Sequence, residues 1–160
     1  MTMRTAITLL AGLLLVGCSV FQSVKNAVVP PGKALKWDTV TFNMPPAINM
    51  NFPLAVDIVT IYEPALVDKI LGMKAADWFA AKDSLLKTYP NALHSRSWEL
   101  APGESKTVPG KPFCEKQVFA VIGFADYFAQ GEHRVRLDEL EGRIRLEFEA
   151  NDFSAGAQQK

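Results

Sequence analysis

Helical spacing in this chain is confined to one stretch, residues 64–86, and this constrains the fold most. Before it, Trp37–Phe42 alternates between apolar and polar residues, and Val56–Tyr62 is β-branched and apolar on both faces, as in a central strand. After it come further strand patterns, most of them separated by turn residues, at 95–100, 105–108, 117–125, 134–137 and 143–149. We therefore expect a mainly β fold: an antiparallel β-sandwich with a two-helix insertion after the second strand.

The insertion is expected to form two amphipathic helices. Pro64 stands where proline is tolerated at a helix start, and Gly72 stands where a helix would stop. The second helix, residues 75–86, has an apolar stripe made of Ala75, Trp78, Phe79, Leu85 and Leu86. Because each helix has one apolar face, both are expected to pack on a sheet.

Turn residues define the connections between the later strands. Ala101-Pro102-Gly103-Glu104 fits a type II turn, so 105–108 is expected to run back antiparallel to 95–100. Gly142 is expected to lead into 143–149, where apolar residues face inward and charged residues face water. The last residues, 154–160, are predicted to be a frayed tail.

The N-terminal residues have the pattern of an export signal. Arg4 supplies a short positive region, and the apolar run Ala6–Val16 is too short to span a bilayer permanently. The run ends in Leu15-Val16-Gly17-Cys18, which resembles the lipobox of bacterial lipoproteins. The resemblance implies cleavage before Cys18 and covalent attachment there of a diacylglycerol and an N-acyl chain, with no other cofactor. The alternative is a simple membrane anchor or signal peptide that happens to contain a cysteine.

These features predict the domain organisation and the location. Residues 1–17 are a cleaved lipoprotein signal peptide, 18–36 a lipid-anchored tether, 37–153 the β-sandwich domain and 154–160 a C-terminal tail. In such lipoproteins an Asp after the lipidated cysteine tends to hold the protein at the inner membrane. Ser19 therefore favours the outer membrane, with the domain facing the periplasm.

The sequence offers little catalytic equipment. The two histidines, His94 and His133, have no metal-ligand spacing, and no nucleophile elbow or phosphate-binding glycine loop occurs. Seventeen basic and seventeen acidic residues cancel, so no charge excess indicates nucleic acid. Cys114, the second cysteine, is expected to be a small buried apolar residue, with a redox or intermolecular role as the alternative. We predict no catalytic residue, no metal site and no small-molecule substrate.

One segment between the first two strands is unusually apolar for a loop. Residues 44–52 carry Met44, Ile48, Met50 and Phe52. Loops generally run over the surface, and clustered exposed apolar side chains mark partner sites. The loop is therefore a candidate partner-binding site. The alternative is that it folds back and buries these side chains locally.

Taken in order, these features resemble the TssJ (SciN) lipoproteins of the bacterial type VI secretion system. The resemblance rests on the lipobox, on Val59-Thr60-Ile61-Tyr62, on Ala76-Asp77-Trp78-Phe79, on Leu100–Ser105 and on Gly123–Tyr127. The chain departs from the family pattern at Thr60, where an Arg is common, and at Phe124-Ala125-Asp126, where the family has Phe-Arg-Asp. It matches over about residues 37–153.

The resemblance implies a transthyretin-like β-sandwich that binds the periplasmic domain of the inner-membrane protein TssM. Its partner-binding loop would comprise Met44, Pro46, Ile48, Asn49, Met50, Asn51 and Phe52. The implied function is a structural adaptor that fixes the membrane complex of the secretion system to the outer membrane. A periplasmic immunity or inhibitor lipoprotein that binds a toxin or hydrolase is the alternative function, and an envelope enzyme is a third.

Overall fold

The structure is a computed structural model that describes residues 31–158. The predicted signal peptide, the lipidation site at Cys18 and most of the predicted tether lie outside the described residues. Within them, no helix has the length and apolar character needed to cross a membrane.

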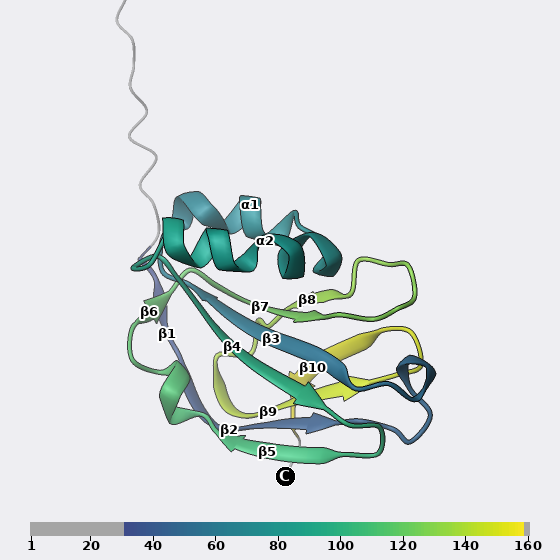
Figure 1. The fold of residues 1–160 in the computed structure, drawn as a ribbon. Helices are drawn as coiled ribbons and strands as arrows, with labels where there is room; N and C mark the ends of the chain where they lie inside the picture. The colour runs from purple at the N-terminus through teal and green to yellow at the C-terminus, as the bar shows by residue number, and fades with distance from the viewer. Residues whose placement is uncertain (1–30, 159–160) are drawn as a thin grey trace, which may run out of the picture.

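Two four-stranded sheets pack face to face (Figure 1). The first has the order β10-β9-β2-β5, with β10 at Phe153–Ala157, β9 at Glu141–Phe148, β2 at Lys36–Asn43 and β5 at Ser105–Pro109. The second has the order β4-β3-β7-β8, with β4 at Leu93–Leu100, β3 at Leu54–Ile61, β7 at Ala120–Ala125 and β8 at Arg134–Arg136. A short pair, β1 (Lys33–Ala34) and β6 (Gln117–Val118), lies at one end of the sandwich.

The main core lies between the two sheets. Alternation along β2 and β9 buries Val40, Phe42, Ile144, Leu146 and Phe148, as the sequence predicted. All the other strand pairs of the two sheets are antiparallel, whereas β2 and β9 are parallel. The predicted mainly β sandwich is thus confirmed, with one parallel pairing at the centre of the first sheet.

The helical insertion covers the outer face of the second sheet (Figure 1). It consists of η2 (Pro64–Leu66), α1 (Val67–Leu71) and α2 (Ala75–Thr88). Trp78 of α2 is fully buried and stacks on Phe124 of β7, with ring centroids 5.2 Å apart. Because β3 contacts a core on each side, it is apolar on both faces, as the sequence predicted.

A buried ion pair ties α2 to the second sheet. Asp57 points from β3 toward the helices and is fully buried. Its carboxylate accepts a hydrogen bond of 2.8 Å from Trp78 Nε1 and lies 3.1 Å from Lys82 Nζ. Lys82, which is itself partly exposed, thus neutralises a carboxylate in the core.

The turn at 101–104 forms, yet it does not make a hairpin. Gly103 has φ 80°, and the Glu104 N–H donates to the Ala101 carbonyl at 3.0 Å. The prediction that 105–108 pairs with 95–100 is wrong, because β4 pairs with β3 and β5 pairs with β2 in the other sheet. The Gly103 N–H donates to Pro45 and the Met44 N–H to Glu104, so the turn is held against the extension of β2. It therefore crosses from one sheet to the other.

The domain extends further at both ends than the sequence predicted. The frayed tail expected at 154–160 is wrong for Ser154–Ala157, which form β10 on the edge of the first sheet. Lys33 and Ala34, assigned to the tether, pair with β6, and Leu35 is buried in the main core. β1 is held by pairing with the distant strand β6, which leaves little trace in a local pattern. β10 pairs with the neighbouring strand β9, but its small residues Ser154–Ala157 have low β-propensity and give no strand pattern.

Candidate partner-binding surface

The loop between β2 and β3, residues 44–53, makes one left-handed turn. Asn49, Met50 and Asn51 form η1 with φ angles of 46°, 53° and 63°. Asparagine is the side chain that tolerates this region best after glycine, which accounts for the two asparagines. Two backbone hydrogen bonds close the turn, from Asn51 to Ile48 at 2.7 Å and from Phe52 to Asn49 at 3.0 Å.

Only some residues of the predicted partner-binding loop are available to a partner. Met44 and Ile48 are buried in the main core, so the loop folds back at these positions. The prediction that these two side chains are exposed is therefore wrong. Pro46, Asn51 and the apolar pair Met50 and Phe52 are exposed, with Met50 71% and Phe52 56% exposed.

Asn49 is the residue that holds this loop to its neighbour. Its side chain is buried, and its Nδ2 donates to the Pro53 carbonyl at 3.2 Å. Its Oδ1 accepts a hydrogen bond of 2.9 Å from the backbone N–H of Phe128. Asn49 therefore positions the two loops relative to each other.

Phe128 is an exposed residue that the sequence analysis missed. It lies in the loop between β7 and β8, residues 126–133, and is 60% exposed. Its ring meets that of Phe52 edge to face, with centroids 5.4 Å apart. An aromatic residue three positions after a buried strand, in a loop that contains glycine, was the signal available in the sequence.

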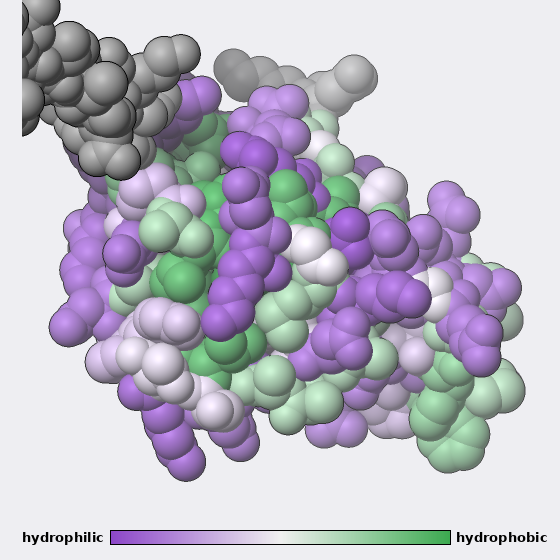
Figure 2. All heavy atoms as spheres, turned by 90° about the horizontal axis from the view of Figure 1, so that it is seen from above, coloured by the Kyte–Doolittle hydropathy of each residue, from purple (hydrophilic) through white to green (hydrophobic). Residues whose placement is uncertain are grey.

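Met50, Phe52 and Phe128 together form what we call the apolar tip. Within residues 31–158 they are the three large apolar side chains that are exposed. Beside them a hollow of about 190 Å³ is lined by Asn49, Met50, Phe128, Ala129, Ala150 and Asn151. Figure 2 looks down on the helices and shows apolar side chains projecting at the right-hand edge, on the side where these loops lie in Figure 1.

The tip rests on a set of buried polar contacts. The Tyr127 hydroxyl contacts the carbonyls of Glu149 and Asp152 at 3.1 and 2.7 Å, and so ties the β7–β8 loop to the β9–β10 turn. Burial, and then the negative charge of Asp152, raise the pKa of Tyr127 well above its usual range. The buried His133 ring contacts the Ala129 carbonyl through Nε2 at 2.8 Å. These contacts fix the loop that carries Phe128.

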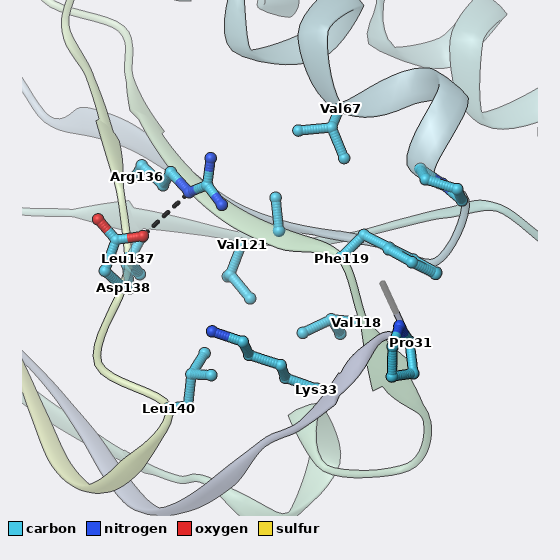
Figure 3. A pocket seen from close by; sticks show the side chains of 12 residues that line it. Pro31, Lys33, Val67, Val118, Phe119, Val121, Arg136, Leu137, Asp138 and Leu140 are labelled. Atoms are coloured by element: carbon cyan, nitrogen blue, oxygen red, sulfur yellow. Dashed lines mark ion pairs between the residues drawn. The ribbon is translucent and has the colours of Figure 1, made fainter. Parts of the chain in front are cut away.

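A second, larger hollow of about 310 Å³ lies next to the first described residue, Pro31 (Figure 3). Val67, Val118, Phe119, Val121, Leu137 and Leu140 give it apolar walls. Its charged groups are Lys33, Arg136 and Asp138, and the last two are paired with each other at 3.0 Å.

The remaining candidate residues are dispersed. Over the described residues, no group of three or more His, Cys, Asp or Glu side chains could hold a metal ion. His94 lies on β4 against Tyr62, far along the chain from His133. Cys114 is half-buried beside the main core, with its Sγ 3.4 Å from the Gly110 carbonyl oxygen.

Solved structures share this fold, although no family model and no curated protein matches the chain. The T6SS lipoprotein TssJ1 from Pseudomonas aeruginosa aligns with a TM-score of 0.57 at 17% identity, over 81% of this chain and 99% of that chain. The chain has the TssJ fold. A structure described as Type VI membrane complex gives a TM-score of 0.58 at 18% identity, over 78% and 98% of the two chains.

Another structure with the TssJ fold is Serratia marcescens Lip, described as a membrane bound component of the Type VI Secretion System. It aligns with a TM-score of 0.53 at 12% identity, over 75% of this chain and 96% of that chain. The described part of the chain therefore spans almost the whole of each of these TssJ-fold structures. The mainly β architecture expected from the sequence resemblance is confirmed by them.

Proposed function

We propose that this protein is a lipid-anchored structural adaptor of a type VI secretion membrane complex. Acyl chains on Cys18 hold it to the outer membrane, and the apolar tip binds the periplasmic domain of a TssM-like inner-membrane protein. Structures with the same fold support the proposal, since they are described as components of this secretion system. A further chain with this fold comes from a structure described as the T6SS protein TssM C-terminal domain from EAEC.

The apolar tip is the observation that carries the proposal. The three exposed large apolar side chains of the described region come from two loops and meet at one place. Burying each of them against a partner would contribute about 1.5–3 kcal/mol. Aromatic anchors surrounded by less important contacts are the usual source of binding energy at protein interfaces.

The positions of the two attachments suit an adaptor. The chain enters the domain at β1, and the eight residues of β2 then run from that end to the β2–β3 loop (Figure 1). The tip therefore lies at the end of the sandwich away from the tether. A membrane tether raises the local concentration of the domain near a membrane-bound partner, so modest affinity suffices.

Binding of the partner domain tests the role of the tip. The probe is the purified periplasmic domain of the TssM-like protein from the same host, offered to the full lipidated chain in detergent. We expect Met50→Asp and Phe128→Asp each to lower its affinity at least tenfold, while Ala65→Asp, an exposed site on η2, leaves the affinity unchanged. Ile48→Asp is unsuitable, because Ile48 is buried and its substitution would unfold the domain.

The same experiment separates the proposed function from the alternative. Unchanged affinity in both tip variants would contradict the assigned surface. If the TssM-like domain does not bind, and a periplasmic toxin or hydrolase from the same gene cluster binds through the tip, the immunity or inhibitor function would replace this proposal.

Lipidation is tested separately. Cys18→Ser is expected to leave a folded domain that is recovered in the soluble periplasmic fraction, with secretion lost. Mass spectrometry of the native protein should show an N-terminal cysteine carrying acyl chains. Secretion that continues with an unacylated protein would contradict the anchoring role.

A further inference from the structure

Acidic side chains lie on the two segments that border the apolar tip. Asp126 is in the β7–β8 loop, two residues before Phe128, and is exposed. Glu149 and Asp152 begin and end the turn between β9 and β10, and both are exposed. That turn supplies Ala150 and Asn151 to the wall of the hollow. The Tyr127 hydroxyl holds the turn against the β7–β8 loop, so the three carboxylates share one end of the molecule with the tip.

These carboxylates are poorly compensated within residues 31–158. Asp126 and Glu149 take part in no ion pair there, and Asp152 has only His133 nearby, at 3.6 Å. Lys74 lines the adjoining hollow together with Asp126 and Phe128, and it forms no ion pair with any of the three carboxylates in the described residues.

One further pair of opposite charges at this end, Arg134 and Glu132, is mutually neutralised. Arg134 forms an ion pair with Glu132 at 3.0 Å and donates a hydrogen bond of 3.3 Å to the Met73 carbonyl. The surroundings of the tip are therefore net negative, although the chain as a whole has no net charge.

We infer that the partner segment that binds the tip is basic: it places one apolar side chain in the hollow between Met50 and Phe128, and Lys or Arg side chains opposite Asp126 and Glu149. This inference rests on the proposed function, and it adds the chemistry of the partner. The hollow of about 190 Å³ has room for an apolar side chain of that segment. The exposed carboxylates then guide the approach of the segment and fix its orientation.

Charges at the rim of an interface act mainly on the association rate, and salt weakens them. Their field extends about 8 Å at physiological ionic strength, enough to cover a tip built from adjacent loops. The affinity of the partner should therefore fall as salt rises, even though the tip itself is apolar.

Charge reversal tests the inference with the same probe, the periplasmic domain of the host's TssM-like protein, measured by surface plasmon resonance at 50 and 500 mM NaCl. Asp126→Lys and Glu149→Lys are each expected to lower the affinity at 50 mM about five- to tenfold through a slower association rate. The double variant should lose most of the salt dependence. The matched controls are Glu115→Lys, beside β6, and Asp68→Lys, on α1; both residues are exposed, and both variants should bind as the parent does.

The outcomes distinguish the inference from the function on which it rests. If Met50→Asp abolishes binding while the reversals leave affinity and salt dependence unchanged, the inference is overturned and the proposed function stands. If neither Met50→Asp nor the reversals change binding, both fail. Asp126→Asn and Glu149→Gln, whose folding is checked by thermal unfolding, should lower the affinity by less than the charge reversals do. A rise in affinity in these variants would also overturn the inference.

Discussion

The side-chain oxygen of Asn49 accepts a hydrogen bond of 2.9 Å from the backbone N–H of Phe128. This bond joins the β2–β3 loop, recognised in the sequence, to the β7–β8 loop, which was not. The exposed residues of the tip thus depend on a residue that is itself buried.

Replacing Asn49 by Ala should destabilise the two loops that carry the tip. The change leaves the Phe128 N–H and the Pro53 carbonyl without their partner, at a cost of about 1–3 kcal/mol in the free energy of unfolding. Asn51→Ala is the matched control, since Asn51 also has a positive φ but is exposed. Urea denaturation of both variants measures the difference, and equal losses would show that the side-chain bonds of Asn49 contribute nothing.

Removing the cation that faces Asp57 should destabilise the contact between helix and sheet. Lys82→Ala leaves a fully buried carboxylate with only Trp78 as a charge-neutral donor. Loss of one partner of a buried pair costs about 3–5 kcal/mol, and the partial exposure of Lys82 places the expected loss near the lower figure. Lys87→Ala, at an exposed position on the same helix, should change the free energy of unfolding by less than about 0.5 kcal/mol. Comparable losses in the two variants would contradict a structural role for the pair.

Alkaline titration should reveal the raised pKa of Tyr127. Its pKa is raised in the folded state, because burial and the charge of Asp152 disfavour the phenolate. The protonated Tyr127 therefore contributes fully to the free energy of unfolding below pH about 10, where an unfolded tyrosine titrates. This contribution is lost progressively as the pH rises above that value. Absorbance at 295 nm should show Tyr127 ionising above that pH, together with unfolding.

Tyr127→Phe is the control for that titration. It should lower the free energy of unfolding at pH 7 by about 1–2 kcal/mol, since two backbone carbonyls lose their hydroxyl partner. It should also remove the loss of stability above pH 10. A parent and variant with the same alkaline dependence would show that another group controls it.

Substitution by alanine is expected to affect stability differently at Gly110 and at Gly156. A Cβ on Gly110 would lie 2.1 Å from the Trp37 carbonyl oxygen, so Gly110→Ala must displace backbone and should cost more than about 3 kcal/mol. A Cβ on Gly156 meets nothing within 4 Å. Gly156→Ala should therefore be neutral or raise stability by up to about 1 kcal/mol, through the lower entropy of the unfolded chain. Thermal unfolding of the two variants checks both signs.

The sequence predicted those parts of the fold in which side-chain pattern decides the structure. Alternating apolar and polar residues located β2 and β9, and a run that is apolar on both faces located β3. The insertion between Pro64 and Thr88 was recognised from its apolar stripe. The choice of sheet for each strand was not predictable in this way. A type II turn has the same local geometry whether it closes a hairpin or crosses between sheets, and only the contacts of Gly103 with Pro45 decide between them.

The candidate surface was predicted in part for a similar reason. Apolar residues in a loop indicated an exposed site, and this is correct for Met50 and Phe52 but wrong for Met44 and Ile48, which alternate back into the core. Phe128 joins them only through folding, because its loop is distant in the sequence. Burial of individual loop residues depends on tertiary contacts that no local pattern contains.

The parallel ladder between β2 and β9 has a consequence for the order in which the molecule can form. The first long strand of the described chain, β2, pairs on one side with β9, so this ladder cannot form before residues 141–148 are present. Pairings that close such long loops form slowly. A chain that has been synthesised only as far as β8 therefore cannot complete its first sheet, and this sheet stays open until β9 has been made.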